Sequence, residues 1–256
     1  MIPVSYYSQN EFSSPKFAYA FAKGCGGSIT DETELFDGPV ALFGSPALWP
    51  VLRQAQAEGR DYFYGDHGYF GNFKNLRKKY FRITKNAYQH DGRGDATPER
   101  FLMMNRPVQP WRKTGGHILL CPNTATYFGL HGLNVDDWLI NVRQTLSEHT
   151  DREIRLRWKV SAEPIATDLE DCWAVVVFSS AAAIDGLIAG VPVFTLAPFG
   201  CTTRMGRTDL SQIEAPLYPD DREPFLWNLA NQQWTIKEVF AGMAWRTLQE
   251  SLRVAA

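Results

Sequence analysis

The sequence predicts an α/β protein with parallel sheets and helices on both faces. Residues 171–199 show the clearest pattern, because the apolar run 175–178 has the length and β-branched composition of a buried parallel strand. Two serines interrupt this run, residues 181–189 follow with helical spacing, and 191–196 resume as a second strand. The 256 residues, 45% of them hydrophobic, suffice for one large α/β unit or for two small domains.

The first half of the chain repeats the alternation of strand and helix, which indicates another parallel sheet. Pro15 suits the first turn of a helix, and the glycines within 24–27 end that helix. A phosphate-binding loop would precede a helix, so we interpret this cluster as a helix stop. The predicted elements are a strand at 3–7, a helix at 15–23, a strand at 38–44, a helix at 46–58 and a strand at 61–64.

The second half predicts a strand at 117–121, a helix at 135–149 and a strand at 153–159, all ahead of the segment 171–199. After it, residues 223–252 form two amphipathic helices that separate near 233–235. Thr235 is the expected N-cap of the second helix.

A polar segment with three prolines, residues 90–113, lacks strong periodicity and is typical of an interdomain linker. We therefore expect two Rossmann-like domains. The first spans residues 1–110, and the second spans residues 111–256 and includes the terminal helices.

Composition excludes several classes of protein. The net charge of −2 argues neither for nor against binding to nucleic acid. No apolar run has the length of a membrane span and residues 1–12 lack a leader pattern, so we expect a cytoplasmic protein without a membrane partner. The cysteines have no paired spacing, which fits a reducing compartment and excludes a cysteine-type zinc ribbon. They are Cys25, Cys121, Cys172 and Cys201.

The serine turn is the first candidate site. A helix that starts at Ser179 and Ser180 brings backbone N–H groups to the carboxyl end of a strand, where a phosphate can bind. Alternate positions of the strand at 153–159 place Arg155, Arg157 and Lys159 on one face, which suits a diphosphate. An ordinary α/β turn and a solubilising surface are the alternative interpretations.

The loop 65–69 is the second candidate, because it follows the third strand at the edge where α/β proteins bind ligands. Asp66 is the expected general base for a hydroxyl nucleophile, and His67 is the second choice. The alternative is a turn in which Asp66 caps the backbone.

A basic segment at 71–95 interleaves cations with aromatic residues, a combination suited to nucleic-acid binding. A solvated surface balanced by acids elsewhere is the alternative. The cations are Lys74, Arg77, Lys78, Lys79, Arg82 and Lys85, and the aromatic residues are Phe73, Tyr80, Phe81 and Tyr88.

Three segments, namely 155–159 (RLRWK), 173–193 with its serine pair, and 229–248, resemble the donor-binding domain of a GT-B glycosyltransferase. This resemblance implies two Rossmann-like domains that face each other across a cleft, with terminal helices that pack back toward the first domain. It places Asp185 near the donor ribose, where the family commonly has a glutamate. The implied donor-binding residues are Asn123, Thr124, Arg157, Lys159, Ser179, Ser180, Ala181 and Asp185.

The branch resembled includes capsule-type and phage transferases, and residues 65–69 and 80–86 are similar to the phage-type members. Some of these attach sugars to hydroxymethylated bases in DNA, which a duplex must expose by distortion or extrusion. The implied acceptor-binding residues are Ser8, Lys74, Arg77, Lys78, Lys79, Tyr80, Arg82 and Lys85.

The resulting hypothesis is transfer of a sugar from a nucleotide diphosphate sugar, most simply a UDP-sugar, to a hydroxymethylated base in double-stranded phage DNA. The chain has no Asp-x-Asp motif in a loop, so we expect neither a metal nor another cofactor, with electrostatic stabilisation by the serine turn instead. We expect a monomer or homodimer. The alternatives are the same reaction on a polysaccharide or other glycan, and a non-catalytic nucleotide- or DNA-binding α/β module.

Overall fold

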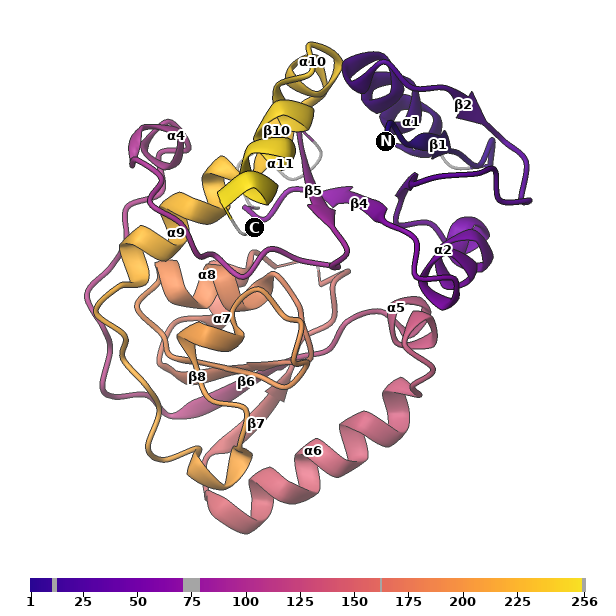
Figure 1. Cartoon of the computed structure of the whole chain (residues 1–256). Helices are drawn as coiled ribbons and strands as arrows, with labels where there is room; N and C mark the ends of the chain where they lie inside the picture. Colours follow the sequence, from indigo (N-terminus) through magenta and orange to yellow (C-terminus); the bar gives the residue numbers. More distant parts are fainter. Residues whose placement is uncertain (11–12, 71–78, 162, 255–256) are drawn as a thin grey trace. The chain divides into compact units, whose positions relative to one another are not determined.

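The structure is a computed structural model that describes residues 1–10, 13–70, 79–161 and 163–254 (Figure 1). It divides into two compact units. Of the described residues, unit 1 holds 1–69, 79–89 and the C-terminal segment from Gln232, whereas unit 2 holds Phe70 and His90–Asn231. Each unit has its own sheet.

Unit 1 is built on a sheet with the strand order β10-β5-β4-β3-β1-β2. The strands β2, β1, β3 and β4 are parallel, and β5 and β10 add antiparallel pairs at one edge. Its elements are β1 (Val4–Tyr6), α1 (Ser13–Cys25), β2 (Ile29–Thr30), β3 (Val40–Phe43), the 3₁₀ turn η1 (Pro46–Leu48), α2 (Trp49–Ala57), β4 (Tyr62–His67), β5 (Tyr80–Lys85), β10 (Gln233–Thr235), α10 (Ile236–Phe240) and α11 (Met243–Val254).

The C-terminal helices complete the core of unit 1. Phe17 and Phe21 of α1 share one buried apolar cluster with Val239 and Ala244. Gly24 allows α1 and α10 to approach each other closely, since a Cβ at this position would overlap the carbonyl oxygen of Val239. The expected return of the terminal helices to the first domain is thereby confirmed.

Unit 2 is built on a fully parallel sheet with the strand order β7-β6-β8-β9. All six residues of β8 are buried, as its unbroken apolar run predicts. The elements are α4 (Glu99–Leu102), β6 (His117–Cys121), α5 (Ala125–Leu130), α6 (Val135–His149), β7 (Glu153–Leu156), α7 (Ile165–Asp168), β8 (Cys172–Val177), α8 (Ala182–Ile188), β9 (Val193–Thr195), the 3₁₀ turns η2 (Thr203–Met205) and η3 (Leu210–Gln212), and α9 (Arg222–Asn231).

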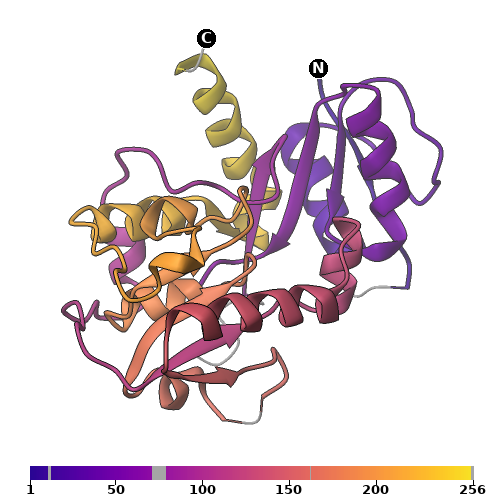
Figure 2. The same ribbon diagram turned by 90° about the horizontal axis from the view of Figure 1, so that it is seen from below.

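Helices cover both faces of this sheet. Val176 of β8 shares a core cluster with Val142 and Leu146 of α6, the long helix drawn in rose in Figure 2. The preceding residue, Val175, lies on the opposite face and packs against Gly186 of α8. The predicted α/β class with two Rossmann-like units is confirmed.

The division into units differs from the expected boundary at residue 110, because the segment 90–113 packs as part of unit 2. The N–H of Gln109 donates to the carbonyl of Ile188, and the N–H of Arg112 donates to that of Gly190. Gly190 has a φ of +76°, and a Cβ there would overlap the Pro110 carbonyl. The segment therefore lies against the end of α8 and does not act as a free linker.

Two strand predictions need correction. Residues 80–85, expected only as a basic segment, form β5, which pairs with both β4 and β10. The strand expected at 153–159 ends at Leu156, so the alternation does not reach the residues beyond it. Among the described residues, no helix is both long and apolar enough to cross a bilayer.

Candidate functional site

The sheet of unit 2 has a topological switch point between β6 and β8. After β6 the chain forms β7 on one side of that strand. It then crosses over and forms β8 on the other side, so the connections from this point run in opposite directions. Loops that follow two such strands leave the carboxyl edge of the sheet in opposite directions. This edge is where open α/β sheets hold their ligands.

A hydrogen bond joins the loops after β6 and β8 at this edge. The backbone N–H of Ser179 donates to the side-chain oxygen of Asn123 at 3.0 Å. Thr124, the next residue, is the N-cap of α5 and accepts from the N–H of Tyr127. Four residues expected to bind a donor, Asn123, Thr124, Ser179 and Ser180, are therefore gathered at one edge.

The helix after the serines begins later than predicted. Ala181 is the N-cap of α8 and makes no side-chain capping bond, while the Ser180 hydroxyl accepts from the N–H of Ala182 at 3.3 Å. The expected helix start at the two serines is therefore corrected to Ala182, and Ser180 forms a local turn one residue ahead of the cap. A hydroxyl that accepts a hydrogen bond still has its own proton to donate, so Ser180 keeps a donor for a ligand.

Asp185, expected near a donor ribose, lies in a buried ion pair. Its side chain is 3% exposed, and its carboxylate accepts from the guanidinium of Arg106 at 2.9 Å. Arg106 itself is 10% exposed and comes from the segment that packs onto unit 2. The sequence gives no sign of this pairing, since the two residues lie 79 positions apart. The geometry favours a buried ion pair within unit 2.

The expected row of cations is not formed. Arg157 lies beyond the end of β7, and its guanidinium is paired with Asp168 and donates to the carbonyl of Glu163 at 2.6 Å. Arg155 is exposed and pairs with Glu153 at 2.7 Å. Lys159 is exposed, and within the ranges that the structure describes it forms no ion pair. Only Lys159 of these three thus keeps an uncompensated charge.

Aromatic rings at the same edge of unit 2 were not singled out from the sequence. The ring of His131 stacks on Phe199 at a centroid distance of 4.5 Å and lies 4.9 Å from the ring of Tyr127. Phe178, which follows β8 directly, stacks on Phe128 at 4.7 Å. The signal in the sequence is that aromatic residues occur soon after each of β6, β8 and β9.

A buried thiol lies directly below this edge. Cys121 is the last residue of β6, and burial raises its pKa to about 12. Burial likewise raises the pKa of Cys172, at the start of β8, to about 12. Both groups are therefore neutral thiols near pH 7, and neither is a candidate nucleophile.

In unit 1 the two proposed bases lie on β4 instead of in a loop. One oxygen of Asp66 accepts from Arg82 on β5 at 2.5 Å, and the other accepts from the N–H of His67 at 2.6 Å. The His67 ring lies 5.2 Å from that of Phe43, on the face of the apolar cluster. Successive side chains of a strand point to opposite faces, so the carboxylate and the imidazole do not converge.

The basic segment is partly neutralised where the structure describes it. Arg82 is buried against Asp66, with its guanidinium 5.3 Å from the ring of Tyr69. Lys85 pairs with Asp61 at 2.6 Å. Neither cation presents a free charge to DNA, which corrects the expectation for these two residues.

Of the remaining acceptor candidates, some are described by the structure and the others lie outside the described residues. Lys79 is exposed beside the half-buried ring of Tyr80, and the N–H of Ser8 donates to the Ser14 hydroxyl just after β1. Lys74, Arg77 and Lys78 lie outside the described residues.

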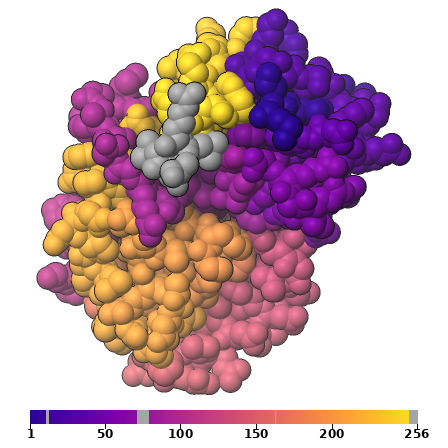
Figure 3. All heavy atoms as spheres, in the orientation of Figure 1, coloured from indigo at the N-terminus to yellow at the C-terminus, as the bar shows by residue number. Residues whose placement is uncertain are grey.

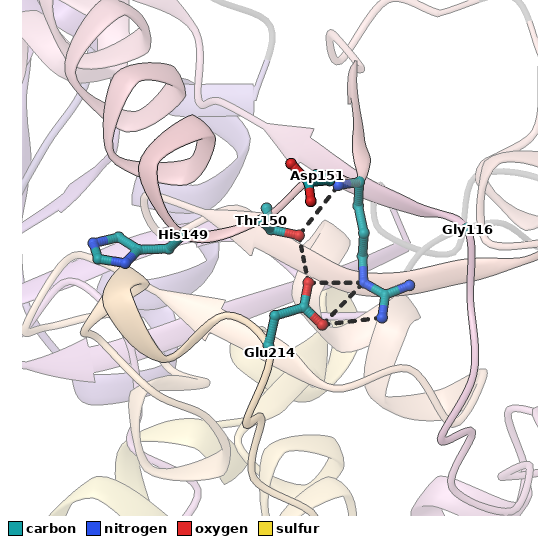
Figure 4. Close-up of a pocket in the computed structure, with 6 residues that line it drawn as sticks. Gly116, His149, Thr150, Asp151 and Glu214 are labelled. Atoms are coloured by element: carbon teal, nitrogen blue, oxygen red, sulfur yellow. Dashed lines mark hydrogen bonds and ion pairs between the residues drawn. The ribbon is translucent and has the colours of Figure 1, made fainter.

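A separate pocket of about 450 Å³ lies at the amino edge of the unit 2 sheet, at the start of β6 and β7 (Figure 4). Its main charged groups compensate each other: Arg152 pairs with Glu214 at 3.0 Å, and Thr150 donates to the same carboxylate. Arg152 also lies 4.1 Å from the centroid of the Trp173 ring. This network ties the start of β7 to the segment after η3, so we interpret it as structural.

No protein family and no curated protein matches this sequence. Among solved structures, the chain is similar to the KpsC β-Kdo 2,7 transferase of Thermosulfurimonas dismutans, with a TM-score of 0.51 and 12% identity over 96% of this chain and 99% of that one. The KpsC β-Kdo 2,4 transferase of the same organism aligns with a TM-score of 0.46 and 14% identity, covering 88% and 89%. The first likeness shows a shared fold and does not by itself establish a shared activity.

Proposed function

We propose that the protein is a glycosyltransferase that moves a sugar from a nucleotide-activated donor to a hydroxyl group of a glycan. The observation that carries this proposal is the topological switch point of unit 2, where a hydrogen bond between Asn123 and Ser179 joins two loops at the carboxyl edge. The fold likeness to a β-Kdo 2,7 transferase over nearly the whole of both chains supports the same class of reaction.

The carboxyl edge at the switch point offers neutral hydrogen-bond donors suited to phosphoryl oxygens. The hydroxyls of Thr124 and Ser180 each accept a backbone hydrogen bond and keep a proton to donate. Lys159, exposed beyond β7, is the proposed cation for the leaving phosphate. Donors arranged in advance around a developing negative charge stabilise the transition state for departure of the nucleotide.

The ring cluster at the same edge supports a nucleotide over a simple phosphate as the ligand. His131, Phe199 and Tyr127 offer apolar ring surface near polar loops, and nucleobases stack on such surfaces. Identification of the base as uracil stays a prediction.

Asp66 is the proposed general base for the acceptor hydroxyl. Arg82 and the N–H of His67 each occupy one lone pair of its carboxylate, and every carboxylate oxygen has a second lone pair for a proton. A purely structural ion pair is the competing interpretation. Asp66→Asn separates the two, because loss of a base abolishes turnover while donor binding persists, whereas loss of an ion pair lowers stability.

A glycan acceptor is favoured over DNA. Two of the described cations, Arg82 and Lys85, are paired with aspartates, which removes two of the charges expected to meet phosphates. The likeness to a Kdo transferase also favours a glycan acceptor.

Metal independence of the reaction stays a prediction, and an activity assay in the presence of a chelator tests it.

The test is a transfer assay read by mass spectrometry. Purified protein is given a panel of nucleoside diphosphate and nucleoside monophosphate sugars, including activated Kdo, with Kdo-containing oligosaccharides or hydroxymethylated duplex DNA as acceptors. A gain of one sugar residue on the oligosaccharide is the expected result. A gain on DNA alone would move the acceptor to nucleic acid, and the absence of both transfer and donor hydrolysis would favour a non-catalytic binding module.

A further inference from the structure

Unit 1 carries an apolar hollow between α1 and α10 that no step of the proposed reaction uses. The hollow has a volume of about 270 Å³, and Tyr19, Ala20, Ile236 and Phe240 form its apolar part. The two helices come from opposite ends of the chain and lie side by side, as indigo and yellow atoms do on the surface in Figure 3.

Two aromatic rings on this surface are exposed to solvent. Tyr19 is 56% exposed and Phe240 is 44% exposed, and their ring centroids are 6.0 Å apart. A phenyl ring has no polar atom that water can satisfy, so its exposure has a cost that contact with an apolar phase removes. The pair therefore indicates a surface that is covered in the functioning protein.

Lysines surround the rings. Lys16 and Lys23 flank Tyr19 on one face of α1, at the spacing of successive helical turns, and Lys237 lies one turn before Phe240. All three are exposed, and in the part of the chain that the structure describes none forms an ion pair. The helix α1 contains no acidic residue. We call these five residues, Lys16, Tyr19, Lys23, Lys237 and Phe240, the α1–α10 patch.

We propose that the α1–α10 patch binds the surface of an anionic lipid bilayer, with the two rings at the level of the headgroups and the lysines facing anionic lipids. Aromatic residues with lysines at their border are the combination that holds peripheral helices at a membrane interface. Each lysine contributes through attraction to the negative surface potential. The expectation of no membrane partner rested on the absence of a long apolar run, and surface binding needs no such run.

Two other occupants fit less well. Two copies of the patch facing each other would bring lysines against lysines, which disfavours a symmetric dimer. An acidic glycan would meet the lysines but would gain little from the exposed phenyl ring of Phe240. The bilayer satisfies both the rings and the charges, and this proposal does not depend on the activity proposed above.

Vesicle flotation tests the proposal on the full chain. Vesicles of phosphatidylcholine alone are compared with vesicles that contain about one-third phosphatidylglycerol, at low and high salt. The expected result is binding to the anionic vesicles only, weakened by salt. Lys16→Glu with Lys237→Glu should lower the partition coefficient by at least about tenfold.

The matched control is Arg143→Glu with Lys113→Glu, which makes the same change in net charge on exposed residues of unit 2. Tyr19→Ser with Phe240→Ser should also weaken binding, whereas Ile140→Ser, which removes an apolar side chain exposed to 63%, should not. Absence of binding to anionic vesicles, equal loss in the patch and control variants, or binding to a soluble acidic polysaccharide in place of vesicles would overturn the proposal.

Discussion

The backbone N–H of Ser179 donates a 3.0 Å hydrogen bond to the side-chain oxygen of Asn123, and this contact joins the loops after β6 and β8. The two residues are 56 positions apart in the chain. Their contact fixes the edge of unit 2 at which a ligand of a parallel sheet is expected.

Removing the Asn123 acceptor should lower the stability of the protein. Asn123→Ala leaves the half-buried N–H of Ser179 without its partner, so we expect unfolding to become easier by about 1 kcal/mol. Urea denaturation measures this change. Asn123→Asp retains an oxygen acceptor and should leave the unfolding midpoint nearly unchanged. Equal loss in both variants would contradict the assigned hydrogen bond.

Breaking the ion pair of Arg106 and Asp185 should be costly. Arg106→Met leaves a buried carboxylate without its counter-charge, and the expected loss of stability is about 3–5 kcal/mol. The double variant Arg106→Met with Asp185→Leu removes both charges and should recover most of the loss. If Asp185 instead contacts a donor ribose, Arg106→Met would leave stability intact and the double variant would lose donor binding.

The network of Glu214 predicts a dependence of stability on pH. Burial alone would raise the pKa of Glu214, but hydrogen bonds from Arg152 and Thr150, together with the Arg152 charge, outweigh it and lower this pKa. The contribution to stability is therefore present above the ordinary carboxyl pKa of about 4.3 and is lost as pH falls through the lowered value.

Urea midpoints of the wild type and Glu214→Gln should differ most near neutral pH and converge in acid. Glu148→Gln, on the exposed side of α6, is the matched control and should show no such convergence. A difference that stays constant with pH would exclude the proposed charge network.

The close approach of α1 and α10 predicts sensitivity at one glycine. Gly24→Ala places a methyl group where the Val239 carbonyl and the Gly242 backbone lie, so α10 must shift. We expect a loss of about 1–3 kcal/mol in thermal or urea unfolding. Lys23→Ala, an exposed neighbour on α1, should change stability by less than about 0.5 kcal/mol. Tolerance of the alanine would argue against packing of the C-terminal segment on α1.

Local signals in the sequence predict much of the fold. The strand His117–Cys121 and the helix Val135–His149 are predicted at both ends, because each has a regular apolar pattern. The structure adds Asn134 as the N-cap of this helix. Thr235 is likewise confirmed as the N-cap of α10, with Glu238 completing a capping box.

The errors concern partners that are distant in sequence. The charge of Arg82 predicts an exposed side chain. The side chain is nevertheless buried, because β5 places Arg82 directly opposite Asp66 on β4. The pairing of Asp185 with Arg106 depends on the fold of the segment 90–113 in the same way. At the candidate site, the serine turn and Asn123 follow from strand ends, but the bond between them depends on the strand order.

Nucleotide binding tests the central claim most directly, namely that the edge marked by Asn123 and Ser179 holds an activated sugar. Isothermal calorimetry with UDP, CMP and their sugar derivatives should show binding to the wild type. Asn123→Asp should lower the affinity at least about tenfold, since a new negative charge faces the phosphates. Glu214→Gln, at the opposite edge of the sheet, should bind as the wild type does. Equal binding by all three proteins, or binding of no nucleotide, would contradict the account.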